Sequence, residues 1–260
     1  MSDDNFDFSD DPCIVGVWPA MALMFHRKDI QAAKQDYVYD VPMESLLSNS
    51  WVGRGIPPEM SLVGGVSSRI VLSEIRSAKP PVPYRDGSAS VKTDDTGGLT
   101  SDTGELSWDT LNGVFSVNTG RTQGVVGFLG GKEIALRDVV FKPTTKFCAL
   151  LLSSLENNSI SKSTHLLLTA AARCENAGAL QNPAKTILLD GGQAPILVES
   201  VEAEVRINFY KRYKTLHVYA LDFSGHRKSE VVRVSNSNAL NFNLRAMHET
   251  IYYEINCTEF

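Results

Sequence analysis

Short strand-like runs separated by turn residues fill the sequence from Glu105 to the C-terminus. Each run is rich in β-branched, aromatic or leucine residues, and clusters of Gly, Asn, Asp or Ser separate it from the next. This spacing is typical of an all-β sandwich. The runs are Val114–Asn118, Gly124–Phe128, Glu133–Phe141, Lys146–Leu155, His165–Cys174, Lys185–Leu189, Ile196–Glu199, Val201–Phe209, Thr215–Leu221, Glu230–Val234, Ala239–Leu244 and Thr250–Ile255.

The order of these runs also limits the fold class. They show no strand–helix alternation and no long amphipathic helix, so neither a doubly wound α/β fold nor a complete (β/α)₈ barrel is expected. We predict a mostly β fold. It would be an antiparallel β-sandwich of one or two immunoglobulin-like or jelly-roll-like modules, with an irregular N-terminal segment.

Two runs differ from the rest because both of their faces are apolar. Val201–Phe209 alternates apolar and polar residues, which indicates a strand with one solvent-exposed face. A hairpin is instead predicted for Lys146–Leu155 and His165–Cys174. Both of its faces are apolar, so each must pack against another part of the protein. We expect Leu150 and Leu152 to point into the core. We expect Leu151 to lie under a second layer, supplied by the N-terminal segment or by a partner domain.

Composition divides the chain into five expected segments. Acidic residues dominate 1–12, and Pro, Gly, Ser, Asp and Thr dominate 80–104. We predict a disordered acidic tail over 1–12 and a linker or long loop over 80–104. The stretch 13–79 would pack on the sandwich. A β-sandwich module would span 105–200, and 201–260 would supply C-terminal strands of the same sandwich or of a small second one.

Charge and hydropathy exclude several classes of partner. The chain has 25 Lys and Arg against 30 Asp and Glu, a net charge of −5, so we expect no nucleic acid and no anionic membrane surface as partner. No apolar run reaches the roughly 18 residues of a membrane span. The start, MSDDNFDFSDDPC, lacks the basic and apolar regions of a secretory signal. The localisation stays open between the cytoplasm and a trimmed secreted enzyme.

One pair of carboxylates is a candidate for catalysis. Glu105 and Asp109 flank Trp108, and glycosidases use two carboxylates about 5–10 Å apart. Residues four apart on a strand, however, are separated by roughly 13 Å. Polar residues at a strand entry are therefore the favoured interpretation. A glycosidase or lyase that acts through these residues remains the alternative.

The histidines and cysteines form no metal-binding motif. The five histidines show no HxH or HExxH spacing, and the four cysteines show no CxxC spacing. We expect no metal and no cofactor. Cys148 and Cys174 lie near opposite ends of the predicted hairpin and could be neighbours. We favour small buried core residues over a disulfide between them.

Several segments resemble a known family. WPAMALMFHRKDI, SDTGELSWD, GVFSVNTGRTQGVVGFLGG and LLLTAAARCENAG are similar to the C-terminal region of clan A glycoside hydrolases of the agarase-like, β-galactosidase-like and cellulase-like type. In that family, β-sandwich modules follow a catalytic (β/α)₈ barrel. The resemblance covers roughly residues 12–260 and implies an accessory module that supports the barrel and binds polysaccharide weakly. The family's acid/base follows an Asn, and this chain has no Asn-Glu pair, so no catalytic residue is carried over.

Aromatic and polar side chains near turns are the candidates for sugar contact. A sugar ring can stack on a flat aromatic face. We nominate Trp108 and Trp51, and we place Trp18 in the core. Arg121 and Gln123 could bind hydroxyl groups or tie a turn. An interaction scaffold without sugar affinity is the remaining alternative.

Overall fold

The computed structural model confirms the predicted mostly β fold, which combines a large curled antiparallel sheet with one N-terminal helix. It describes residues 11–34, 36–42, 62–71, 98–183 and 186–260. The chain divides into two compact units. The smaller unit is Gln31–Phe115, and the larger one combines Met1–Ile30 with Ser116–Phe260.

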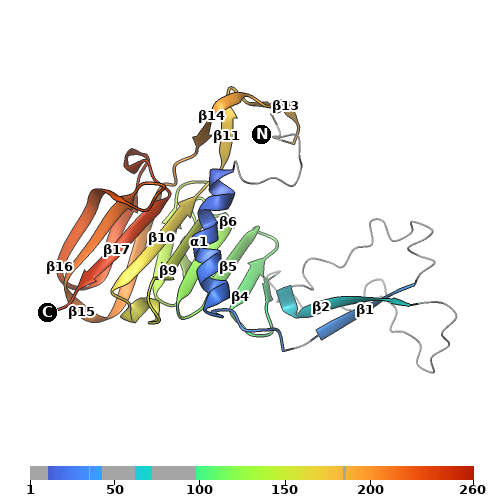
Figure 1. The fold of residues 1–260 in the computed structure, drawn as a ribbon, viewed down its shortest axis with the longest axis horizontal. Helices are drawn as coiled ribbons and strands as arrows, with labels where there is room; N and C mark the ends of the chain where they lie inside the picture. Colours follow the sequence, from blue (N-terminus) through green and yellow to red (C-terminus); the bar gives the residue numbers. More distant parts are fainter. Residues whose placement is uncertain (1–10, 35, 43–61, 72–97, 184–185) are drawn as a thin grey trace. The chain divides into compact units, whose positions relative to one another are not determined.

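The large sheet forms the body of the larger unit (Figure 1). Within this unit the strands of the sheet run in the order β5-β6-β9-β10-β17-β15-β8-β7, and β16 pairs with β15. The pairs from β6 to β7 along this order are antiparallel. The strands are β5 (Val114–Asn118), β6 (Thr122–Phe128), β7 (Ile134–Ala135), β8 (Val139–Pro143), β9 (Phe147–Ser154), β10 (His165–Ala171), β15 (Ala203–Leu221), β16 (Arg227–Leu244) and β17 (Tyr252–Thr258).

The long strand β15 curls the sheet. Its first half pairs with β8, from Ala203 to Ile207, and its second half pairs with β17, from Thr215 to Ala220. The register with β16 breaks between Asn208 and Tyr213, where the strand changes neighbours. Irregular pairing bends a strand and increases its local twist. The C-terminal strands thereby belong to the same sheet as the β9–β10 hairpin.

The predicted two-faced hairpin is confirmed in β9 and β10. Leu150 and Leu152 have no exposed surface, and Leu151, on the other face, is 5% exposed. Helix α1 (Pro12–His26) contacts both strands and supplies the expected second layer (Figure 1). Gly124 lies opposite Leu151, where an added Cβ would stand 2.4 Å from the Leu151 side chain. This glycine makes room for the leucine under the helix.

Helix α1 corrects the expectation of an irregular N-terminal segment and of a tail that reaches residue 12. The Asp11 carboxylate accepts the Cys13 and Ile14 N–H groups at 2.9 Å, and Pro12 occupies the first turn. Both features start helices. The helix buries its small residues Cys13, Gly16 and Ala20.

The opposite side of α1 contradicts the placement of Trp18 in the core. Trp18 is 51% exposed, Met21 53% and Phe25 81%, so Trp18 is not a core residue. Because the buried side is made of small residues, the helix lies close to the sheet. The Tyr252 hydroxyl donates to the Gly16 carbonyl at 2.9 Å. The large residues are left on the outer side.

Two small sheets follow β10 and project from the large one (Figure 1). Strand β11 (Cys174–Ala177) pairs with β14 (Gln193–Val198), and β12 (Leu180–Gln181) pairs with β13 (Leu188–Asp190). We call residues 174–198 the arm. Two short 3₁₀ turns complete the larger unit, η1 (Ile160–Lys162) and η2 (Ala246–His248).

Among its described residues, the smaller unit has a parallel and an antiparallel strand pair. The parallel pair is β1 (Asp36–Pro42) with β2 (Gly65–Val71), and the antiparallel pair is β3 (Gly98–Thr100) with β4 (Leu106–Asp109). Strands β1 and β2 lie within the stretch 13–79, and β3 lies at the end of the loop predicted over 80–104. Across the part of the chain that the structure describes, no helix is long and apolar enough to cross a membrane.

Candidate functional site

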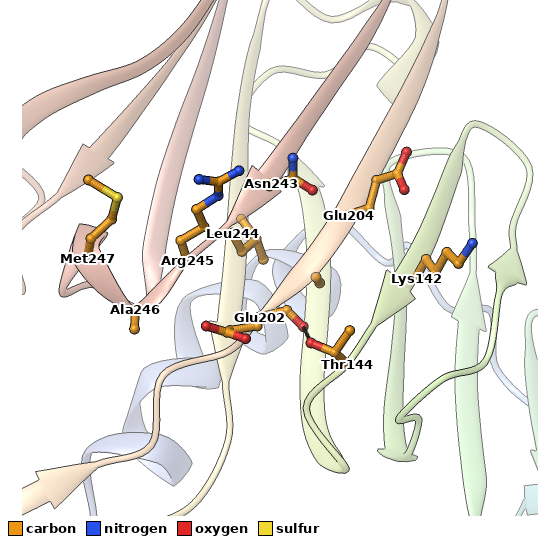
Figure 2. Close-up of a pocket in the computed structure, with 10 residues that line it drawn as sticks. Lys142, Thr144, Glu202, Glu204, Asn243, Leu244, Arg245, Ala246 and Met247 are labelled. Atoms are coloured by element: carbon orange, nitrogen blue, oxygen red, sulfur yellow. Dashed lines mark hydrogen bonds between the residues drawn. The ribbon is translucent and has the colours of Figure 1, made fainter.

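An open groove of about 540 Å³ lies on the larger unit, beside β8, β15, β16 and η2 (Figure 2). Successive side chains of a strand point to opposite faces of the sheet, so every second residue of these strands can face the groove. Ala203 and Leu244 are buried, whereas the polar neighbours beside them are exposed. The polar side chains of the lining are Lys142, Thr144, Glu202, Glu204, Asn243 and Arg245.

Strand register aligns three of these side chains. Glu204 of β15 lies opposite Lys142 of β8 on one side and opposite Asn243 of β16 on the other. Residues directly opposite in an antiparallel pair share a face, about 4.5–5.5 Å apart. Lys142, Glu204 and Asn243 therefore form a line of exposed groups across three strands, which we call the polar row.

The surroundings of the polar row are held by hydrogen bonds. The Thr144 N–H and hydroxyl both donate to the Glu202 carbonyl oxygen, at 2.9 and 3.2 Å. The Asn241 amide donates to Glu204 Oε1 at 3.1 Å, which orients that carboxylate. An ammonium, a carboxylate and an amide together offer both donors and acceptors to a ligand. The groove is therefore suited to a ligand with many hydroxyl groups.

Two sequence-predicted sugar contacts, Arg121 and Gln123, have structural roles. Gln123 is fully buried, donates to Asp138 Oδ2 at 2.7 Å and accepts the Asp138 N–H at 2.8 Å. It ties β6 to the turn before β8 and has no surface for a sugar, so that part of the expectation is corrected. The Arg121 guanidinium donates to the Arg27 carbonyl at 2.7 Å, and its Nε lies 2.7 Å from Asp29.

Arg121 belongs to a buried charge network that joins the end of α1 to β6. The Asp29 side chain has no exposed surface, and it lies 2.7 Å from both the Arg27 and the Arg121 guanidinium groups. The Thr122 hydroxyl donates to the same carboxylate at 3.1 Å. One buried carboxylate between two guanidinium groups is a structural tie, and sequence spacing alone could not show it.

The remaining predicted residues lie in the smaller unit or outside the described residues. Trp108 is half-buried on β4, opposite Leu99. Glu105 accepts the Gln31 N–H at 2.8 Å, and Asp109 accepts the Asn112 N–H at 2.9 Å. Both carboxylates thus hold loop backbone in place. Trp51 lies outside the described residues, and its sugar contact, like that of Trp108, stays a prediction.

Sequence reasoning missed a charged cluster on the face of the sheet that also carries α1. Glu254 of β17 accepts the His165 Nε2–H and Arg227 Nη2–H groups at 2.7 and 2.8 Å. Arg227 lies over the Tyr219 ring, 4.1 Å from its centroid. The Arg227 hydrogen bond is the main cause that lowers the pKa of Glu254. The alternation of polar residues along β17 could have pointed to this face, but the cross-strand partners could not be read from it.

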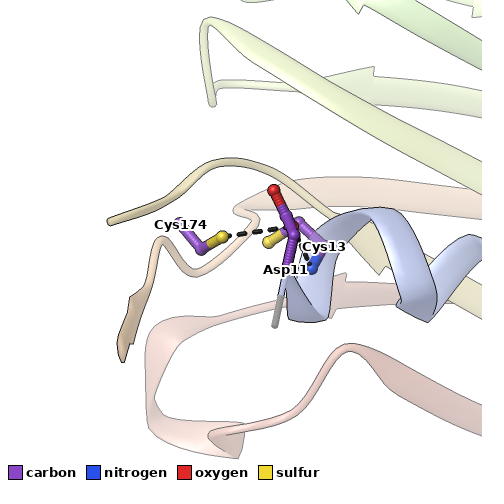
Figure 3. Close-up of side chains that lie close together, drawn as sticks. All are labelled: Asp11, Cys13 and Cys174. Atoms are coloured by element: carbon purple, nitrogen blue, oxygen red, sulfur yellow. Dashed lines mark hydrogen bonds between the residues drawn. The ribbon is translucent and has the colours of Figure 1, made fainter. Parts of the chain in front are cut away.

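Cys148 and Cys174, the pair whose disulfide the sequence left open, are not bonded to each other. All four cysteines are free, and burial raises the pKa of Cys148, which has no exposed surface, to about 12. Cys174 lies at the start of β11, where its thiol donates to the Asp11 carboxylate at 3.1 Å, beside Cys13 (Figure 3). The neighbour of Cys174 is thus Cys13, which the sequence analysis did not consider.

Comparison with known proteins gives no relative for this chain. No protein-family model matches it, and neither a curated protein nor a solved structure matches it. The resemblance to clan A glycoside hydrolases stays a hypothesis based on short segments.

Proposed function

We propose that this chain is a non-catalytic accessory module of a glycoside hydrolase, and that it binds polysaccharide weakly in the groove around the polar row. The catalytic partner would be a (β/α)₈ domain, as the sequence resemblance implies. The observation that carries the binding part is the alignment of Lys142, Glu204 and Asn243 along an open groove on a rigid sheet. Rigid strands hold such side chains more precisely than loops do.

The charges in the groove favour a neutral polysaccharide. Lys142 and Arg245 supply two positive charges, and Glu202 and Glu204 supply two negative ones. A polyanion would meet the two carboxylates, and a polycation would meet the two cationic groups. Neutral hydroxyl groups can accept from the first pair and donate to the second.

The same geometry sets the expected affinity. The groove lining has no aromatic platform, so binding would depend on hydrogen bonds, each worth about 0.5–1.5 kcal/mol net. Four such bonds give about 4 kcal/mol, which corresponds to a Kd of about 1 mM. Retention on a polymer would then depend on avidity, through repeated contacts or through the catalytic partner.

Affinity electrophoresis tests this proposal. Native gels cast with agarose, xylan, soluble glucan or galactan should retard the chain, and Glu204→Ala and Asn243→Ala should abolish the retardation. Glu199→Ala, which removes an exposed carboxylate outside the groove lining, is the matched control and should migrate like the wild type. Retardation that survives both groove variants would contradict the groove assignment.

The two alternatives predict different results. A glycosidase or lyase would release reducing sugar in a reaction that Glu105→Gln stops. An interaction scaffold would show neither retardation nor sugar release on any of the four polymers. Retardation without release is the result that the accessory-module proposal predicts.

A further inference from the structure

Two thiols and a carboxylate meet where α1 and β11 begin (Figure 3). One ligand atom from each of Asp11, Cys13 and Cys174 lies within 4.8 Å of the other two. Asp11 and Cys13 start the helix, whereas Cys174 is 163 positions further along the chain than Asp11. The fold, and not a local turn, brings the three groups together.

We propose that Asp11, Cys13 and Cys174 bind a Zn²⁺ ion. Zinc takes thiolate sulfur at about 2.3 Å and carboxylate oxygen at about 2.0–2.2 Å in a tetrahedral arrangement. In that geometry two ligand atoms lie about 3.5–3.8 Å apart. The distances between the ligand atoms of the cluster lie around this range. The Cys174 sulfur is 3.1 Å from Asp11 Oδ1, and all three ligand atoms lie within 4.8 Å of one another.

The ligand types select the metal. Two sulfur atoms favour a thiophilic cation and disfavour Mg²⁺ and Ca²⁺, which take oxygen ligands. Three protein ligands leave the fourth tetrahedral position for water or another small ligand. Asp11 is already fixed in place, because its Oδ1 atom accepts the Cys13 and Ile14 N–H groups at 2.9 Å.

The charge of the complex suits its position. Two thiolates and one carboxylate carry three negative charges, so the complex with Zn²⁺ has a net charge of −1. It lies at the N-terminus of α1, where the helix dipole stabilises negative charge. The metal would join α1 to the first strand of the arm, and would thereby connect the layer over β9 and β10 with the projecting sheets.

Titration of the reduced full chain with Co²⁺, followed by displacement with Zn²⁺, tests the site. Cobalt bound to thiolate gives an absorption band that oxygen ligands do not give. We expect this band at one equivalent of Co²⁺, its loss on addition of Zn²⁺, and at least a tenfold weaker affinity in Cys174→Ser. Cys257→Ala, which removes a thiol at the end of β17 that is not part of the cluster, should titrate like the wild type.

A second measurement needs no variant. Zn²⁺ at about 100 times its Kd should raise the Tm of the reduced wild type by about 5–10 °C. It should also protect Cys13 and Cys174, identified by mass spectrometry, from alkylation. Absence of the cobalt band in the reduced wild type, or a band unchanged in Cys174→Ser, would overturn the proposal. A Cys13–Cys174 disulfide together with no metal uptake after reduction would assign the pair to redox chemistry instead.

Discussion

Removal of the Asp29 carboxylate should be among the most destabilising changes in the larger unit. The Asp29 side chain is fully buried, and the Arg27 and Arg121 side chains are 11% and 28% exposed. Asp29→Ala would leave two mostly buried guanidinium groups without their anion. Breaking a buried ion pair by removal of one partner costs about 3–5 kcal/mol. For a chain of this size, that corresponds to a fall in Tm of about 10 °C.

Urea unfolding followed by circular dichroism measures the effect. Glu199→Ala is the matched control, because Glu199 pairs with Arg173 at 3.0 Å but both side chains are largely exposed. An exposed pair of this kind contributes about 0–1 kcal/mol. Asp29→Asn, which keeps the shape and loses the charge, should fall between the two. If Asp29→Ala costs no more than Glu199→Ala, the charge network around Asp29 does not stabilise the fold.

Three further predictions concern the sheet. Leu150→Ala and Leu151→Ala should each lower the free energy of unfolding by about 2–5 kcal/mol, because one leucine fills the core and the other lies under α1; two unchanged melting temperatures would contradict this packing. Gly124→Ala should cost about 1–3 kcal/mol in urea unfolding, since its Cβ would meet the Leu151 side chain; an unaffected midpoint would show that the helix layer yields freely. The folded state lowers the pKa of Glu254, so the ionised group stabilises the fold above its unfolded pKa, near 4.5, and this contribution is lost as the pH falls through the folded pKa. Arg227→Gln should flatten the acid limb of the stability profile, and an identical limb would refute the assignment.

The strand pattern was predictable because it depends on local alternation. From Val201 to Phe209 every odd residue is buried and every even residue is exposed, as the sequence indicated. A period of two is dictated by strand geometry and needs no knowledge of the neighbouring strands. The same logic identified both apolar faces of the Leu150–Leu152 stretch.

Helix α1 was missed because hydrophobicity alone hides its amphipathic character. Its buried side consists of small residues, including Gly16 and Ala20, and its exposed side carries large apolar ones, including Trp18 and Phe25. The run is therefore apolar all round and shows no polar face. Asp11 followed by Pro12 is a local start signal that could have predicted the helix.

The groups that make the candidate sites were beyond sequence reasoning because they depend on long-range register. Glu204 meets Lys142 and Asn243 only through the pairing of β15 with two other strands. Gln123 is fully buried and donates to Asp138, 15 positions further along the chain. Neither of these long-range contacts can be inferred from the local sequence. The sequence therefore could not distinguish a role of Gln123 in sugar binding from a role in a turn.

Titration with soluble neutral oligosaccharides, followed by ¹H–¹⁵N NMR, tests the proposed function most directly. The account predicts fast-exchange shifts, at millimolar ligand, for the amides of Lys142, Glu204 and Asn243 and for those of the adjoining groove residues. The Glu204→Ala variant should lose these shifts and keep the rest of its spectrum. Shifts centred on Trp108, or no shifts with any of the oligosaccharides, would contradict the assignment of the groove as the binding site.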